Sequence, residues 1–353
     1  MLKKLWPKNS LKKNTLTQRL REITVLFSAG ISLLQTLQMI SETAQTNLEK
    51  NLFKTVRQLI ETGLSLSEAL EHFPVQFDAI TCALIAAGET SGTLEMMLKR
   101  IVSCREKKHQ FYLKIKRALF YPILLLITAC LTILFMFTFV IPAFANLFAD
   151  LGGQLPALTQ FFIDSAGFVI HGGWLIGPLL IIGLFTFHEL KKYSPRYLVW
   201  ADRFRLNCPL FGNLYKKTII QGFCQNLSTI LSAGIPLSKA LSLITETLSS
   251  HTFKINLQHA YNALQQGLTF HETLQETQLF SDQIIQMVAI GEEAGKLDDM
   301  LEKIAEIREQ EIEQFVELLG QMLEPLIIGL LGLVVGSIVL AMYLPIVKLG
   351  MVV

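Results

Sequence analysis

The densest group of chemically competent side chains in this sequence is acidic and surrounds residue 295. Its members are Glu292, Glu293, Asp298, Asp299 and Glu302, and Glu89 and Glu95 repeat part of the pattern earlier in the chain. Clustered carboxylate oxygens suit a hard cation, and they also suit a basic partner. Acidic residues are equally favourable near the N-termini of helices, where the helix dipole is positive. We expect helix-end charges here and assign no metal site; a bound cation and a basic partner are the alternatives.

Other chemical motifs are missing from the sequence. It contains no GxxxxGK[ST] phosphate loop and no GxGxxG motif after a strand, so nucleotide binding has no support. The seven histidines show no HExxH spacing, and the five cysteines form no CxxC pair, which predicts free thiols. The formal net charge of +2 is too small to predict a nucleic-acid partner. We therefore expect no catalytic residue, no cofactor and no enzymatic activity.

The elements that position these acids occur twice. The segment Leu26–Leu37 returns 204 residues later as Ile230–Leu241. After a one-residue deletion the offset becomes 203, and Gly88-Glu89 matches Gly291-Glu292. Further matched pairs are Glu42 with Glu246, Gly63 with Gly267, Phe77 with Phe280, Gly92 with Gly295, and Pro122 with Pro325. A register held over about a hundred residues indicates a duplicated module.

Each copy has the pattern of a helical bundle. Apolar residues recur every three or four positions on both sides of an Ala-Gly-Ile sequence. Gly30 and Gly234 predict sharp corners there, because glycine readily adopts the left-handed conformation that ends a helix. Ser65–Glu68 and Thr269–Glu272 both fit the capping box that opens the next helix. We expect several short helices and one long amphipathic helix in each copy.

The composition predicts a membrane protein. Hydrophobic residues make up 51% of the chain and charged residues 17%, and residues 118–149 contain no charged side chain. Segments 119–141, 167–187 and 323–347 are long enough to cross a bilayer, which needs about 20 apolar residues. Lys and Arg precede the first segment and follow the second, but are absent from 142–166. This asymmetry predicts that both bundles are cytoplasmic and that the C-terminus lies outside.

The fold expected is therefore an all-α membrane protein with two homologous cytoplasmic bundles and three transmembrane helices. The second membrane helix is unduplicated and returns the chain to the cytoplasm, so that both copies keep the same orientation. The predicted division is a basic leader (1–15), first bundle (16–118), first membrane helix (119–141), periplasmic loop (142–166), second membrane helix (167–187), linker and second bundle (188–322), third membrane helix (323–347) and periplasmic tail (348–353).

Specific motifs across the chain resemble those of the inner-membrane platform proteins of type IV pilus assembly and type II secretion, the PilC/GspF family. The motifs are the two Ala-Gly-Ile corners, Gly88-Glu-Thr-Ser-Gly92, Ile141-Pro-Ala-Phe144, Pro209-Leu-Phe-Gly212, Gly291-Glu-Glu-Ala-Gly295 and Leu323-Glu-Pro325. The tail Ala341-Met-Tyr-Leu-Pro-Ile346 is similar to the pilus branch. The resemblance covers residues 16–353.

The resemblance implies a non-enzymatic, multi-pass scaffold in the bacterial inner membrane. Its implied partners are a cytoplasmic hexameric ATPase, pilin or pseudopilin subunits, other inner-membrane assembly proteins, further copies of itself and the lipid bilayer. The implied function is to couple the ATPase to extraction of pilins from the membrane into a growing fibre. The secretion-system platform is the alternative. A small transporter is disfavoured, because transport paths usually display charged residues at mid-membrane.

Eight positions are the candidates for partner contact or for a structural motif. In the second copy the family pattern favours Arg-Thr where this chain has Gln225-Asn226, whereas Arg21 stands at the matching place in the first copy. If this arginine contacts a partner, only the first bundle retains it. The full set is Arg21, Gly30, Glu89, Gly92, Gly234, Glu292, Glu293 and Gly295.

Overall fold

The computed structural model describes residues 13–150, 211–248 and 250–350, together with residues 11, 160, 161, 164, 167, 202, 205, 206 and 208. All secondary structure within these residues is helical. Most of the predicted leader, nearly all of the predicted second membrane helix and the last three residues of the tail lie outside the described residues. The chain divides into two compact units: residues 1–113 with 199–312, and residues 114–198 with 313–353.

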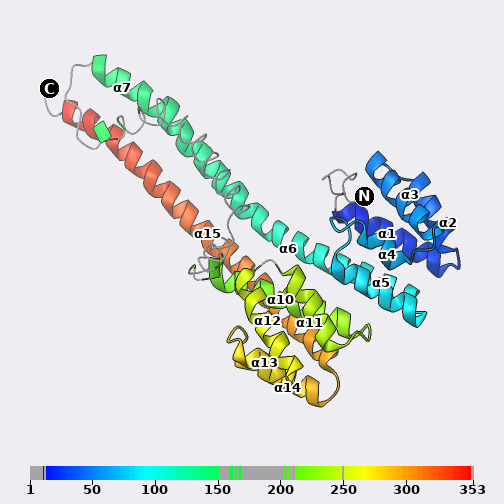
Figure 1. Ribbon diagram of the computed structural model, residues 1–353. Helices are drawn as coiled ribbons and strands as arrows, with labels where there is room; N and C mark the ends of the chain where they lie inside the picture. The colour runs from blue at the N-terminus through cyan, green and yellow to red at the C-terminus, as the bar shows by residue number, and fades with distance from the viewer. Residues whose placement is uncertain are drawn as a thin grey trace. The chain divides into compact units, whose positions relative to one another are not determined.

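The helices follow the same order in both copies (Figure 1). The first copy contains α1 (Lys13–Ser28), α2 (Leu33–Glu42), α3 (Asn47–Glu61), α4 (Leu66–Glu71), α5 (Ala79–Ser91) and α6 (Leu94–Phe135). The second contains α10 (Phe211–Leu231), α11 (Leu237–Thr247), α12 (His251–Gln265), α13 (Phe270–Glu276), α14 (Asp282–Glu293) and α15 (Leu297–Gly350). This order, with five shorter helices and one long helix in each copy, is the duplicated bundle that the sequence predicts.

Glycine forms the corner after the first helix of each copy. Gly30 has φ +85° and Gly234 has φ +79°, the left-handed conformation that the sequence predicts. Ser32 then caps α2, its hydroxyl accepting the Gln35 N–H. In the second copy Pro236 stands at the cap position, where its extended ψ of 144° precedes the first helical residue, Leu237.

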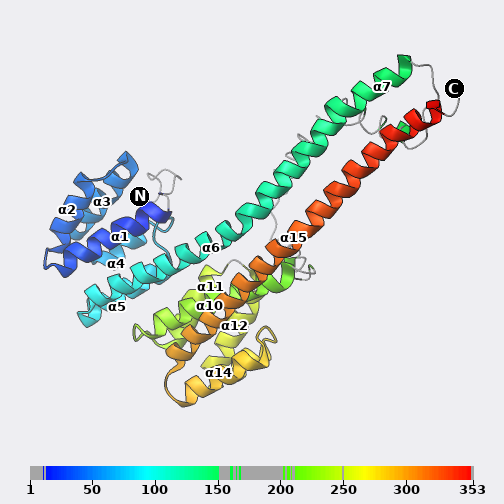
Figure 2. The same cartoon turned by 180° about the vertical axis from the view of Figure 1, so that it is seen from behind.

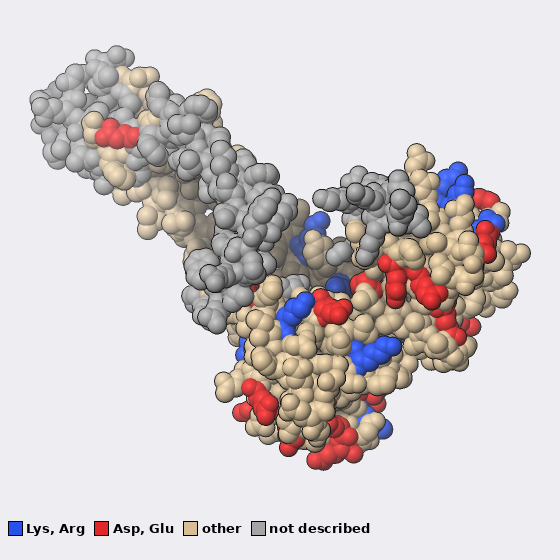
Figure 3. Space-filling view, viewed as in Figure 1, with Lys and Arg blue, Asp and Glu red and all other residues tan. Residues whose placement is uncertain are grey.

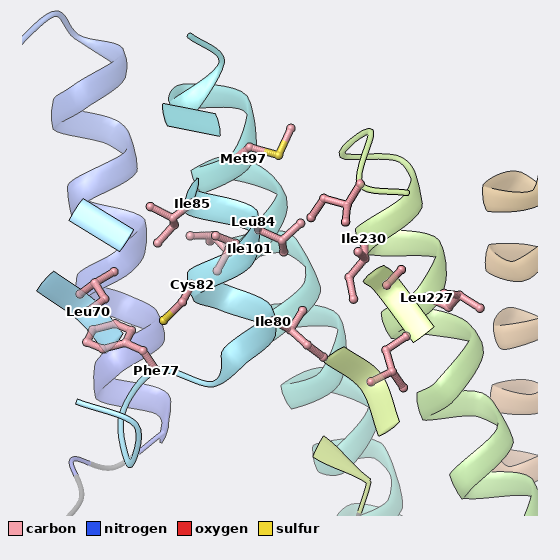
Figure 4. Close-up of a cluster of buried hydrophobic side chains, with 14 of the residues drawn as sticks. Leu70, Phe77, Ile80, Cys82, Leu84, Ile85, Met97, Ile101, Leu227 and Ile230 are labelled. Carbon is pink, nitrogen blue, oxygen red and sulfur yellow. The ribbon is translucent and has the colours of Figure 1, made fainter. Parts of the chain in front are cut away.

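The buried apolar side chains of both copies form one continuous core within the first unit. In the first copy the core includes Ile80 and Leu84 of α5, and in the second it includes Leu227 and Ile230 of α10. In Figure 4 these side chains lie between α5 and α10. Burial of such residues contributes about 25 cal/mol per Å² of apolar surface, so the apolar face of each helix holds it in the unit.

Two helical segments that extend into the second unit are long and apolar enough to cross a membrane: Leu94–Phe144 and Leu297–Tyr343. Their apolar windows are only 6% and 22% buried, unlike the core helix of a soluble protein. Within this unit α6 and α15 run side by side in both views (Figure 1, Figure 2). The Tyr121 hydroxyl donates to Glu324 at 3.0 Å, and Lys114 Nζ lies 2.8 Å from Glu313.

The predicted loop that begins at residue 142 starts as a helix. α6 continues through a π-helical turn, η2 (Met136–Val140), into α7 (Ile141–Asp150). Pro142 lacks an N–H and its ring crowds the carbonyl four residues earlier, so an ordinary α-helix would kink there. The wider π turn η2 ends two residues before Pro142, and the helix continues through the proline as α7. At the other end of the chain, α15 extends to Gly350, beyond the predicted end of the third membrane helix at residue 347.

Candidate functional site

Glu89 and Glu292 of the two Gly-Glu motifs hold the N-terminus of the preceding short helix. The Glu89 carboxylate accepts the N–H groups of Leu66 and Ser67 and the Ser67 hydroxyl. The carboxylate of Glu292 accepts the N–H groups of Phe270 and His271 at 2.7 and 3.1 Å. These are N–H groups that an α-helix cannot satisfy internally.

The capping boxes complete the same helix ends. In the first copy Ser65 Oγ accepts the Glu68 N–H, and Glu68 accepts the Ser65 N–H in return. In the second copy the Thr269 N–H donates to Glu272 at 2.9 Å. Together with Glu89, the box in the first copy gives a partner to every N–H from Ser65 to Glu68. α4 and α13 are only six and seven residues long, so these caps are a large part of what keeps them helical.

The hydrogen bonds to Glu292 favour the charged form of its carboxyl group. Burial opposes ionisation of its carboxyl group, but the hydrogen bonds from Phe270 and His271 outweigh this effect and lower its pKa. The His271 Nδ1 atom lies 2.8 Å from Glu292 Oε2. The expectation of helix-end charge therefore describes Glu89 and Glu292, each of which caps a helix other than its own.

The glycines before these glutamates allow close packing. A Cβ at Gly88 would lie 2.8 Å from Met97 Cγ and 3.0 Å from the Leu94 Cα atom. At Gly291 it would lie 2.8 Å from Met300 Cγ. The start of the long helix thus rests directly on the backbone of the helix before it. Gly92 and Gly295 have positive φ and form the turn that brings the two helices together.

The remaining candidates do not converge on one pocket with the glutamates. Arg21 is exposed and forms an ion pair with Glu106 of α6. Glu293 is exposed. Asp298 and Asp299 lie in the first turn of α15, where the helix dipole favours acids. Among the described residues, no group of three or more His, Cys, Asp or Glu side chains is placed to hold a metal ion.

Two buried polar clusters were not among the sequence candidates. Arg19 pairs with the fully buried Glu49, and its guanidinium also contacts Glu22 and the Thr43 carbonyl oxygen. The repeat register holds the signal for this pair, because Phe223 and Phe253 occupy the matching positions in the second copy. When a charged pair in one copy is replaced by an apolar pair at the same two positions of the other copy, the two side chains are expected to contact each other.

The second missed cluster is centred on Asp202, which is buried. Its carboxylate accepts hydrogen bonds from the Tyr215 and Ser250 hydroxyls and from the Thr252 N–H, at the start of α12. Burial raises the pKa of Asp202, but these hydrogen bonds outweigh burial and the net pKa is lowered. No motif announces this cluster, because the residues that donate to Asp202 lie 13 to 50 residues from it in the chain.

On the face of the bundles seen in Figure 3, acidic and basic side chains are scattered singly or in small groups over a surface made mostly of other residues. The geometry so far defines a class: a duplicated helical-bundle protein with two helices that could cross a membrane, in which the motif residues serve helix ends and packing. Comparison with known sequences makes the class specific. The type II secretion system protein F family matches this chain twice, at residues 20–142 and 223–345. The chain belongs to that family.

Individual relatives come from both pilus and secretion systems. The chain is 38% identical to the type IV pilus assembly protein TapC of Aeromonas hydrophila, over 94% of this chain and 80% of the relative. It is 34% identical to the type IV pilus assembly protein PilC of Pseudomonas aeruginosa, over 94% of this chain and 89% of the relative. A type II secretion system protein F of Aeromonas hydrophila is 30% identical over 94% and 85%. The resemblance inferred from the motifs is confirmed.

Proposed function

We propose that this protein is an inner-membrane platform of type IV pilus assembly that couples a cytoplasmic hexameric ATPase to extraction of pilin subunits into the growing fibre. The observation that carries the proposal is similarity along almost the whole chain to proteins named for pilus assembly. The identity to these relatives, 34–38%, exceeds the 30% to the secretion protein. The tail motif at residues 341–346, which is similar to the pilus branch of the family, supports the same choice.

The proposed arrangement places both bundles in the cytoplasm and the C-terminus in the periplasm. The distribution of Lys and Arg supports it, and the two long helices, α6 and α15, are the duplicated membrane crossings. Segment 167–187 is the proposed third crossing. Alkaline phosphatase fused within residues 142–166 should be active, and the same enzyme inserted after residue 250 should be inactive. Activity at the second position would contradict the proposed topology.

The proposed role is mechanical, and the chain itself is not an enzyme. In support of this role, the two acids that the copies share, Glu89 and Glu292, are engaged in helix capping. Purified full-length protein should therefore hydrolyse no ATP and should leave that activity to its partner ATPase. ATP hydrolysis by the purified protein that is abolished by a point substitution in this chain would contradict the proposal that it is not an enzyme.

A clean deletion of the gene tests the function directly. We expect loss of surface pili by electron microscopy, with normal levels of unassembled pilin in the membrane, and restoration by the gene in trans. Secretion of folded periplasmic proteins should stay normal. Normal piliation with a secretion defect would instead support the secretion-system platform, which is the alternative function. Solute uptake by the purified chain in liposomes would support a transporter.

A further inference from the structure

The two copies contact each other through different faces. The first contributes α5 and α6, and the second contributes α10, α11 and the start of α15. Arg100 of α6 donates to the Ser232 carbonyl oxygen at 2.9 Å, and Lys107 Nζ lies 2.8 Å from Glu302. Since α10 and α11 are the counterparts of α1 and α2, the contact is largely heterologous. One matched position is shared, because Lys99 and its counterpart Glu302 of α15 both line the space between the copies.

The face used by the second copy is the groove between α10 and the start of α15. α6 of the first copy lies along it, and a space of about 370 Å³ remains between them. On the α10 side this space is lined by Gln225, Ser228 and Thr229, and on the α15 side by Glu302. Thr229 Oγ1 lies 3.9 Å from Cys104 Sγ of α6.

The first copy has the same groove, between α1 and α6. Its α1 wall consists of Arg21, Thr24, Val25 and Ser28, the first three of which match the α10 residues that line the occupied groove. This groove has a volume of about 360 Å³. Val25 is 61% exposed, whereas its counterpart Thr229 is buried in the occupied groove.

The second copy correspondingly retains the face that would enter such a groove. The counterparts of Leu84, Arg100 and Cys104 are Met287, Lys303 and Ile307. Lys303 is exposed, and Met287 and Ile307 are partly exposed. The residues at the two exposed faces suit each other. Cys104 and Thr229 lie together in the contact within the chain, and their counterparts on the exposed faces, Ile307 and Val25, are both apolar. A cation is kept as well, since Lys303 matches Arg100.

We propose that a second copy of this chain docks its α14/α15 face into the α1/α6 groove, repeating between chains the contact that joins the two copies within one chain. Ile307 then packs against Val25, and Lys303 reaches the carbonyl oxygen of Ser28 as Arg100 reaches that of Ser232. Because the contact is heterologous, chains associate head to tail rather than about a two-fold axis. The inference concerns the purified chain alone and holds whether its cargo is a pilus or a secretion system.

Directed disulfide formation tests the contact between full-length chains. Two differently tagged chains, Val25→Cys and Ile307→Cys, are prepared with the five native cysteines replaced by alanine and with helicity checked against the parent. We expect a mixed disulfide dimer and no Val25→Cys homodimer. A dimer through Val25→Cys alone would show an isologous contact and overturn the proposal. The absence of any mixed product in samples that do self-associate would also overturn it.

A second measurement leaves the native cysteines in place. Val25→Glu should weaken self-association in detergent by at least tenfold in sedimentation equilibrium, and adding Ile307→Lys should restore most of it. Val75→Glu is the matched control, because Val75 is 64% exposed and lies outside the groove. Equal effects at positions 25 and 75, or a chain that is monomeric at every concentration, would overturn the proposal. So would a Val25→Glu variant that loses only the binding of another assembly protein, since the groove would then serve that partner.

Discussion

Replacing Arg19 with phenylalanine should destabilise the first bundle strongly, and replacing Glu49 with phenylalanine as well should restore most of the loss. Arg19 is 8% exposed and Glu49 is fully buried, so the single change leaves a buried carboxylate without its cation. Breaking a buried ion pair in this way costs about 3–5 kcal/mol. Replacing both partners with apolar residues of fitting shape is often neutral or stabilising.

The second copy supplies the design of the double variant. Its matching residues, Phe223 and Phe253, are fully buried and both contact the ring of Phe280, at centroid distances of 5.5 and 6.5 Å. The counterpart of Phe280 in the first copy is Phe77, which is also buried. The double variant therefore rebuilds an aromatic cluster that this fold already contains. A residual loss of about 1 kcal/mol is expected, because the Gln45 N–H loses its acceptor on Glu49.

Hydrogen exchange of the full-length protein in nanodiscs measures the effect. Since each 1.4 kcal/mol is tenfold, slow amides of α3 should exchange roughly a hundred- to several-thousand-fold faster in Arg19→Phe, and α12 serves as an internal reference. Arg21→Ala is the matched control: it lies on the same helix but removes an exposed ion pair, worth about 0–1 kcal/mol. A loss below about 1 kcal/mol in Arg19→Phe, or no recovery in the double variant, would refute the reasoning.

Three further predictions concern the helix ends and glycines. Glu89→Ala should free two N–H groups of α4 and cost about 1–3 kcal/mol, measured as faster exchange of α4 relative to α13. The pKa of Glu292 is lower in the folded protein than its ordinary value of 4.5, so its charged form stabilises the fold. This stabilisation is complete above pH 4.5 and is lost as the pH falls through the lower folded pKa. Glu292→Gln should abolish this acid dependence of thermal unfolding. Gly30→Val should cost about 1–2 kcal/mol through its positive φ, since no atom lies within 4 Å of the added Cβ, whereas Gly88→Val, which collides with α6, should cost more in the same assay. Equal losses for the two glycine variants, or acid unfolding unchanged by Glu292→Gln, would contradict these expectations.

The sequence predicts the helical architecture well because its signals are local and doubled. A corner glycine or a capping box occupies four residues or fewer, and finding it at the same register in both copies separates it from chance. The boundaries were less predictable at the membrane helices. Composition defines an apolar length, but it announces neither the π turn before Pro142 nor the continuation of the helix past that proline.

The roles of the candidate residues were harder to predict, because they depend on contacts distant in sequence. Glu89 and Glu292 stand out in the sequence as acids shared by both copies. Their acceptor role, however, needs N–H groups of α4 or α13 that lie 21 to 23 residues away in the chain and beside them in space. The exposure of Arg21 likewise follows from where α6 passes. Sequence periodicity shows which face of a helix is apolar, but it does not show which neighbour covers that face.

Duplication followed by divergence explains why the two copies retain their capping glutamates but differ in their cores and faces. Glu89 and Glu292 accept backbone N–H groups that are present in both copies whatever their side chains. The same residue type therefore serves in each copy. A buried pair such as Arg19 with Glu49 can be replaced by another combination of side chains, provided that both members change together. The second copy carries two phenylalanines at these positions. The faces differ for another reason. Once one copy docks on the other through a heterologous contact, the copies no longer have the same neighbours. Val25 shows that difference, because it is 61% exposed while its counterpart Thr229 is 5% exposed, and it lies in the groove proposed to receive the next chain.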